Sequence, residues 1–130
     1  MAPKICFSGN TATIKSEGTS ETLTKKAGII YKLPDCTIAH ITGKVEKKEI
    51  KEYQAEVIIL PTKQAEQIIT KLKPKLAILC GDKEAVYTAR ELQHKTGIQT
   101  IAAEDNLVVD LYAYSALAEQ KSLGKFTTKE

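Results

Sequence analysis

The sequence has no tryptophan, only three cysteines and two histidines, and a single arginine among its 130 residues. The three cysteines, Cys6, Cys36 and Cys80, show no CxxC spacing, so free thiols are favoured over a disulfide framework or a zinc site. No apolar run approaches the roughly 20 residues that a membrane-spanning helix needs. The start of the chain lacks the apolar segment of a signal peptide, so we expect a cytoplasmic protein with no membrane partner.

Familiar catalytic motifs are missing as well. There is no Walker loop, no GxGxxG sequence and no Ser-His-Asp arrangement. A hydrolytic zinc site needs at least three protein ligands that converge on one ion. Neither His40 nor His94 has a second histidine, a cysteine or a carboxylate at a suitable local spacing, and His94 suits the end of a helix. We therefore predict no catalytic residue, no metal ligand and no cofactor.

Lysine supplies nearly all of the positive charge. The net charge is +3 at pH 7, and Arg90 is the only arginine among 19 basic residues. Because specific readers of nucleic acid rely on arginine, this composition favours a solvated surface of lysine and glutamate. A weak contact with a nucleic-acid backbone stays open as an alternative.

What the chain does contain is enough apolar sequence for a hydrophobic core. Its 42% hydrophobic and 27% charged residues are typical of a globular protein. No linker or internal repeat divides it. We predict a single domain over residues 1–130, with a C-terminal tail at 113–130.

The first half of the chain predicts two pairs of strands, with turns at Gly9-Asn10 and Pro34-Asp35. The polar stretch Gly18–Thr24 predicts an exposed loop, and Lys44–Tyr53 favours a helix. The predicted strands are Lys4–Ser8 with Thr11–Lys15, and Ala27–Leu33 with Cys36–Ile41.

From residue 56 onward, apolar runs of strand length alternate with helical periodicity. Val57–Leu60 and Leu76–Leu79 are continuous apolar runs, the pattern of strands buried on both faces. Thr62–Leu72 and Asp82–Lys95 carry apolar residues at helical spacing, and a proline or a glycine follows each. Two further strands, Ile98–Ala103 and Leu107–Leu111, predict a hairpin, and a short helix is expected at 113–121.

This order of elements predicts the α/β class. Right-handed crossovers should place the helices on one face of a mixed sheet, with Val57–Leu60 and Leu76–Leu79 as adjacent parallel central strands. The predicted core is Ile29, Ile38, Val57, Ile59, Ile68, Leu72, Leu76, Ile78, Val86, Ala89, Leu92 and Ile101.

The second half of the chain carries a resemblance to a known family. The Lys-Pro-Lys sequence at 73–75 leads a helix into the strand Leu76–Leu79, and the closing segment begins Thr96-Gly97-Ile98 and ends Asp110-Leu111. This combination resembles the C-terminal half of the metallo-β-lactamase-fold hydrolases. The resemblance covers residues 27–112 and is strongest from Ile68 to Leu111.

The metal ligands of that family are absent from the matching positions. The strand that normally runs into Thr-His-Phe-Gly runs here into Cys80-Gly81-Asp82, and Lys44 stands where the family has its metal-bridging aspartate. Asn10 stands where a Gly-His-Thr motif has its histidine. The motif His-x-His-x-Asp-His, which anchors the first metal and activates water in the family, occurs nowhere. With it the N-terminal half of the family's fold is missing.

The resemblance therefore implies a vestigial site. Its candidate binding residues are Asn10, His40, Lys44, Cys80 and Asp82. Most of them also have an ordinary explanation: His40 is a strand residue, Lys44 is an exposed lysine, and Cys80 with Asp82 is a buried thiol followed by a helix cap.

Two functions follow from the resemblance. The first is a non-catalytic, metal-free protein with half of the family's αβ/βα sandwich and with helices mainly on one face, which acts by binding or assembly. Its uncovered sheet face would be buried in a homodimer or against a partner protein. The alternative is a metal-dependent hydrolase, such as a phosphodiesterase or a nuclease, with a site completed across a dimer or by a partner chain. Its contributors would be His40, Asp35, Asp82 and Asp110.

Overall fold

The computed structural model describes residues 4–8, 11–15, 21–33, 36–80, 83–103 and 107–110. These residues group into two compact units, 4–15 with 107–110 and 21–103. Each unit contains one sheet. The single domain over residues 1–130 stays a prediction, and the predicted tail at 113–130 lies outside the described residues.

The smaller unit is an antiparallel sheet of three strands in the order β2-β1-β9. The pairing of β1 (Lys4–Ser8) with β2 (Thr11–Lys15) agrees with the sequence pattern. The other edge of β1 pairs with β9 (Val108–Asp110). Ile5 lies opposite Val109, and both side chains are buried.

The predicted hairpin between Ile98–Ala103 and Leu107–Leu111 is wrong. The first segment forms β8 (Gln99–Ala102) at the edge of the larger sheet, whereas the second forms β9 in the smaller sheet. The turn signal at Glu104-Asp105-Asn106 is local, so it does not specify the strand with which each neighbour pairs. Long-range packing, such as that of β9 on β1, decides the partners.

The larger unit is built on a mixed sheet of six strands in the order β3-β4-β5-β6-β7-β8. The strands from β3 to β5 pair antiparallel, and those from β5 to β8 pair parallel. The fold class is therefore α/β with a mixed sheet. β6 and β7 are adjacent and parallel, as predicted, with Val57 opposite Leu76 and Leu60 opposite Leu79. Besides β8, the strands of this sheet are β3 (Glu21–Thr24), β4 (Gly28–Lys32), β5 (Thr37–Ile41), β6 (Val57–Pro61) and β7 (Leu76–Cys80).

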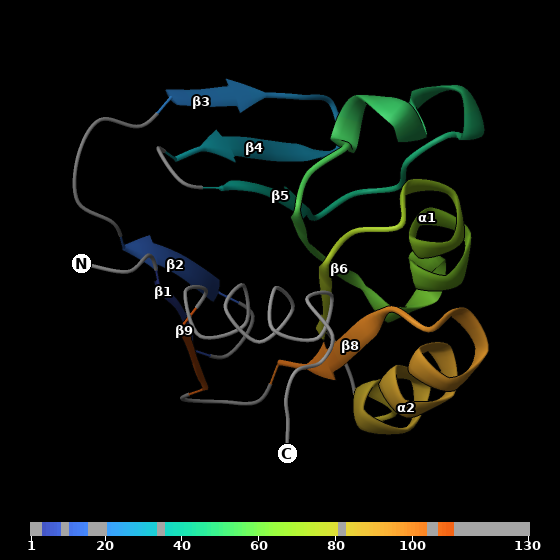
Figure 1. The fold of residues 1–130 in the computed structure, drawn as a ribbon. Helices are drawn as coiled ribbons and strands as arrows, with labels where there is room; N and C mark the ends of the chain where they lie inside the picture. Colours follow the sequence, from blue (N-terminus) through green and yellow to red (C-terminus); the bar gives the residue numbers. More distant parts are fainter. Residues whose placement is uncertain are drawn as a thin grey trace, which may run out of the picture. The chain divides into compact units, whose positions relative to one another are not determined.

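Each crossover between neighbouring parallel strands contains helical turns. The strand order advances in one direction, and such crossovers are almost always right-handed, so the helices should share one face. Figure 1 shows α1 and α2 on the same side of this sheet, as predicted. The helices are the 3-10 helix η1 (Lys47–Tyr53), the 3-10 turn η2 (Thr62–Gln64) with α1 (Ala65–Leu72), and α2 (Ala85–Thr96).

Both faces of the central strands are buried. Ile58 and Ala77 belong to one apolar cluster with Ile68 and other residues of the helices. The neighbouring residues Ile59 and Ile78, which point to the other face because side chains alternate along a strand, are 0% exposed. This confirms the interpretation of the continuous apolar runs as strands buried on both faces.

Most of the predicted core is buried, with three exceptions. Ile29 and Ile101 are only partly buried, and Val86 is 40% exposed. On α2 the buried face includes Ala85 and Ala89, which are four residues apart. Val86 lies about 100° around the helix from Ala85 and so misses that face.

Several predicted elements need new bounds. The expected loop Gly18–Thr24 contains the edge strand β3, whose four residues are all exposed and mostly polar, so they lack the apolar alternation that would reveal a strand. The helix expected over Lys44–Tyr53 is the shorter 3-10 helix η1, and that over Thr62–Leu72 begins as the 3-10 turn η2. The described part of the helix expected over Asp82–Lys95 is α-helical from Ala85. The helix expected at 113–121 lies outside the described residues.

The two α-helices of the described residues each end in a left-handed residue. Gly97 ends α2 as predicted, with φ of 78°, and its amide donates to the carbonyl of Gln93 at 2.9 Å. At the end of α1 the left-handed residue is Lys73, immediately before Pro74, with φ of 48°. No helix within the described ranges is long and apolar enough to cross a membrane.

Candidate functional site

The ends of β5 and β6 frame a groove of about 700 Å³. One wall is residues 42–47, which follow β5, and the other is Pro61, Lys63, Gln64 and Gln67, at the end of β6 and in the helical turns after it. The carboxyl end of a parallel sheet is the usual place of ligand sites in open α/β folds. The volume is also typical of small-molecule sites. This groove is therefore the candidate functional site.

The side chain of Gln64 joins the two walls. Its Oε1 accepts a hydrogen bond from the amide of Val45 at 3.0 Å, and its Nε2 donates to the carbonyl of Gly43 at 2.5 Å. The side chain of Val45 is buried beneath the loop. Because one amide group satisfies two backbone groups, it holds the loop after β5 against the helical turns after β6.

The same loop is held at its start by Ala27. The amides of Thr42 and Gly43 donate to the carbonyl of Ala27 at 2.8 and 2.9 Å. The amide of Ala27 in turn donates to the buried hydroxyl of Tyr53 at 2.9 Å. These bonds connect the beginning of β4, the end of β5 and the end of η1. These hydrogen bonds within the chain hold the loop wall of the groove in place, and such preorganisation lowers the entropic cost of binding a ligand.

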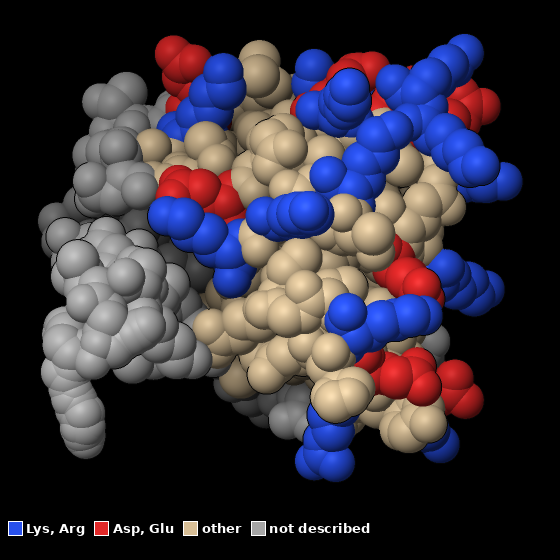
Figure 2. Space-filling view, turned by 45° about the vertical axis from the view of Figure 1, so that its right-hand side comes forward, with Lys and Arg blue, Asp and Glu red and all other residues tan. Residues whose placement is uncertain are grey.

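Positive charge predominates along the groove. Lys44, Lys47 and Lys63 line it together with one carboxylate, Glu46, and all four side chains are exposed. Within the described residues none of the four forms an ion pair. Over the face drawn in Figure 2, basic and acidic side chains are interspersed. Lys44 is thus a predicted site residue that lies in the groove.

His40 lies on β5 and not in the groove. Its side chain is on the face opposite that of Ala39 and Ile41, which belong to the helix-covered core. Burial lowers the pKa of His40 from its usual value of 6.5, because desolvation disfavours the charged imidazolium. Its carbonyl packs closely against Gly28 on β4, where an added Cβ would collide with the carbonyl oxygen. These contacts fit the ordinary explanation of a strand residue.

Cys80 ends β7 and is partly buried. Its Sγ lies 3.6 Å from the carbonyl oxygen of Leu60, and its own carbonyl accepts a hydrogen bond from the hydroxyl of Thr62 at 3.4 Å. Burial raises the pKa of the thiol. Because the thiolate is the nucleophile, this environment weakens Cys80 as a nucleophile.

Among the described site candidates, His40 and Cys80 lie on strands that are not neighbours. β6 lies between β5 and β7, so at least two strand spacings, or about 10 Å, separate the backbones at His40 and Cys80. Within the described part of the chain, no group of three or more His, Cys, Asp or Glu residues could hold a metal ion. The other predicted contributors lie outside the described residues or side chains: Asn10, Asp35, Asp82 and Asp110.

The roles of Gln64 and Gln67 were not predicted. A buried strand followed by a helix start is a signal for a ligand site. It occurs at Pro61-Thr62 as well as at Cys80-Gly81-Asp82, so it could have indicated the groove. The contact of Gln64 with a backbone amide 19 residues earlier has no counterpart in a local pattern.

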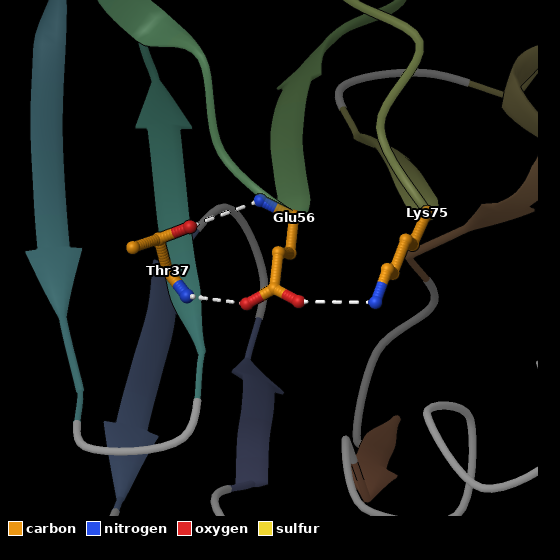
Figure 3. Close-up of polar contacts among 3 residues, drawn as sticks. All are labelled: Thr37, Glu56 and Lys75. Carbon is orange, nitrogen blue, oxygen red and sulfur yellow. Dashed lines mark hydrogen bonds and ion pairs between the residues drawn. The ribbon is translucent and has the colours of Figure 1, made fainter. Parts of the chain in front are cut away.

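At the opposite end of these strands, Thr37, Glu56 and Lys75 form a polar cluster (Figure 3). The carboxylate of Glu56 accepts a hydrogen bond from the amide of Thr37 at 3.3 Å and lies 3.3 Å from Nζ of Lys75. The hydroxyl of Thr37 accepts a hydrogen bond from the amide of Glu56 at 3.0 Å. Since these groups bond to one another across the beginnings of β5, β6 and β7, they act in the architecture of the sheet.

Comparisons with protein-family models, with curated proteins and with solved structures find no match for this chain. The structure itself defines the class: an α/β protein with a mixed sheet. Its candidate site is the groove at the carboxyl ends of β5 and β6.

Proposed function

We propose that the chain is a non-catalytic, metal-free protein of the metallo-β-lactamase-like type that acts by binding, with the groove as its binding site. The proposal includes the half-sandwich fold implied by the resemblance and a cytoplasmic location. The observation that carries it is an ordered groove of about 700 Å³ at the end of the sheet where α/β folds bind ligands.

Lys44 connects this groove with the resemblance. It lines the groove, and it stands where the resemblance expects the metal-bridging aspartate. An ammonium group repels a divalent cation and attracts an anion. The lysine therefore supports a site that binds without a metal.

A metal-dependent hydrolase completed by a second chain is the alternative. Turnover tests it directly, with a chromogenic phosphodiester as the substrate and added zinc or manganese as the metal. The proposal predicts a rate no higher than that of the metal alone. Hydrolysis that requires the protein and disappears in His40→Ala would contradict the proposal, because His40 is a contributor that the alternative requires.

The homodimer remains part of the proposal. Ile38, Ile59 and Ile78, which belong to the predicted core, are each 0% exposed. The large exposed hydrophobic side chains of the described residues are Leu23, Val86 and Tyr87. Leu23 lies on β3, whereas Val86 and Tyr87 lie on α2. The oligomeric state in solution distinguishes a homodimer from a complex with a partner protein.

A further inference from the structure

The three lysines that line the groove outnumber its carboxylates. Lys44, Lys47 and Lys63 form no ion pair within the described ranges, and three lysines against Glu46 leave an excess of two positive charges. An unpaired group of cations around a cavity favours an anionic ligand. The ion pairs of the described residues elsewhere in this unit join Lys25 with Glu52 at 3.7 Å, Lys75 with Glu56 at 3.3 Å, and Lys95 with Glu66 at 2.8 Å.

The groove also offers polar and apolar contacts beside its charges. The side chain of Gln67 is exposed on the groove wall and has no hydrogen bond within the described part of the chain. Pro61, partly exposed at the end of β6, adds an apolar surface. The amide of Gln64 is already bonded to the loop, so it shapes the groove and leaves ligand contacts to its neighbours. Such a mixture fits an organic molecule with a charged group.

We propose that the groove binds a small organic phosphate. Lys44, Lys47 and Lys63 hold the phosphate, and the organic part lies against Pro61 and Gln67. Lysine binds phosphate as a compact point charge and does not need the forked geometry of arginine. This inference rests on the proposed function, because it names the ligand class of the same groove.

A long polyanion fits this surface less well. Binding along a nucleic acid needs a stripe or patch of cations that follows several phosphates. The face drawn in Figure 2 mixes basic and acidic side chains, and Arg90 is the only arginine of the chain. The excess charge of the groove is small and local, which matches one phosphate group.

The test is a titration of the ¹⁵N-labelled full chain with three probes: adenosine 5′-monophosphate, pyrophosphate and succinate. We expect both phosphates to shift amides in residues 42–47 and 62–67, and succinate to bind more weakly. Lys44→Gln and Lys63→Gln should each weaken binding about fivefold. Glu46→Gln should strengthen it, because it removes the one negative charge of the lining. Lys71→Gln, which removes an exposed lysine of α1 outside the groove, should bind like the wild type.

Other results would overturn the inference. Shifts confined to another surface, equal weakening by Lys71→Gln, or equal affinity for succinate would each contradict it. Tighter binding of a single-stranded oligonucleotide than of the mononucleotide would assign the surface to nucleic acid instead. Phosphate release from either phosphate probe would contradict the non-catalytic function while leaving the ligand class supported, so the two proposals can fail separately.

Discussion

At the scale of single residues, the shape of the groove depends on one side-chain amide. Gln64 uses both its oxygen and its nitrogen on the backbone of the loop after β5. Gln67 lies one helical turn further along the same segment and lines the same groove without such a bond. The two glutamines therefore form a matched pair, one that shapes the site and one that is available to a ligand.

Replacing Gln64 by alanine should lower the free energy of unfolding by about 1–2 kcal/mol, because the amide of Val45 and the carbonyl of Gly43 lose their partner. Urea denaturation measures the loss, and hydrogen exchange at the amide of Val45 should become faster. Gln67→Ala should stay close to the wild type in both measurements. Equal effects of the two substitutions would show that the bonds of Gln64 do not hold the loop.

His40 predicts a dependence of stability on pH. Its pKa is lower in the folded state than in the unfolded chain, so the unfolded chain takes up the proton more readily. The free energy of unfolding should therefore fall as the pH drops below about 6.5, whereas above that pH both states are neutral and His40 contributes no slope. In His40→Gln, the loss between pH 7 and pH 5 should be smaller than in the wild type. Identical losses in urea melts of the two proteins would contradict the assigned direction of the pKa shift.

At the scale of elements, the beginnings of three parallel strands depend on Glu56. Its carboxylate bonds to Thr37 and pairs with Lys75, and its carbonyl accepts hydrogen bonds from the amides of Lys75 and Leu76. The ion pair itself is largely solvated and contributes little. A substitution of the Glu56 side chain is therefore costly mainly because it removes the acceptor of the hydrogen bond from the amide of Thr37.

Glu56→Ala should destabilise the protein by about 1 kcal/mol, because the partly buried amide of Thr37 loses its acceptor. Glu66→Ala is the control, since it breaks the exposed pair with Lys95 and no backbone hydrogen bond within the described residues. Thermal unfolding of both variants and the wild type gives the comparison. A larger loss in Glu66→Ala would contradict the role given to the strand cluster.

Elements with strong local patterns could be predicted from the sequence, and those set by distant contacts could not. Val57–Leu60 and Leu76–Leu79 are apolar without interruption, and they are the buried parallel strands expected. The edge strand β3 is polar, so its pairing with β4 leaves no periodic signal. The partner of β9 depends on β1, which lies about a hundred residues away in sequence. The same limit applies to the site. Lys44 was predicted as a candidate, but the segment around Gln64, which forms the other wall of the groove, was not.

At the scale of the whole molecule, the described residues form two compact units with one sheet each. The larger unit carries the groove and the residues that shape it. The oligomeric state of the chain decides whether a second copy can add to the binding surface. An interface of standard size would bury about 800 Å² on each chain.

Native mass spectrometry of the full chain, purified without chelator, tests the central claim most directly, because one spectrum reports both assembly and bound metal. The claim of a metal-free binding protein that assembles as a homodimer predicts twice the 14.3 kDa chain mass, with no increment of a zinc or manganese ion. A species that carries about one such ion per chain, and loses it in His40→Ala, would contradict the metal-free claim. A single-chain mass at every micromolar concentration would contradict the homodimer.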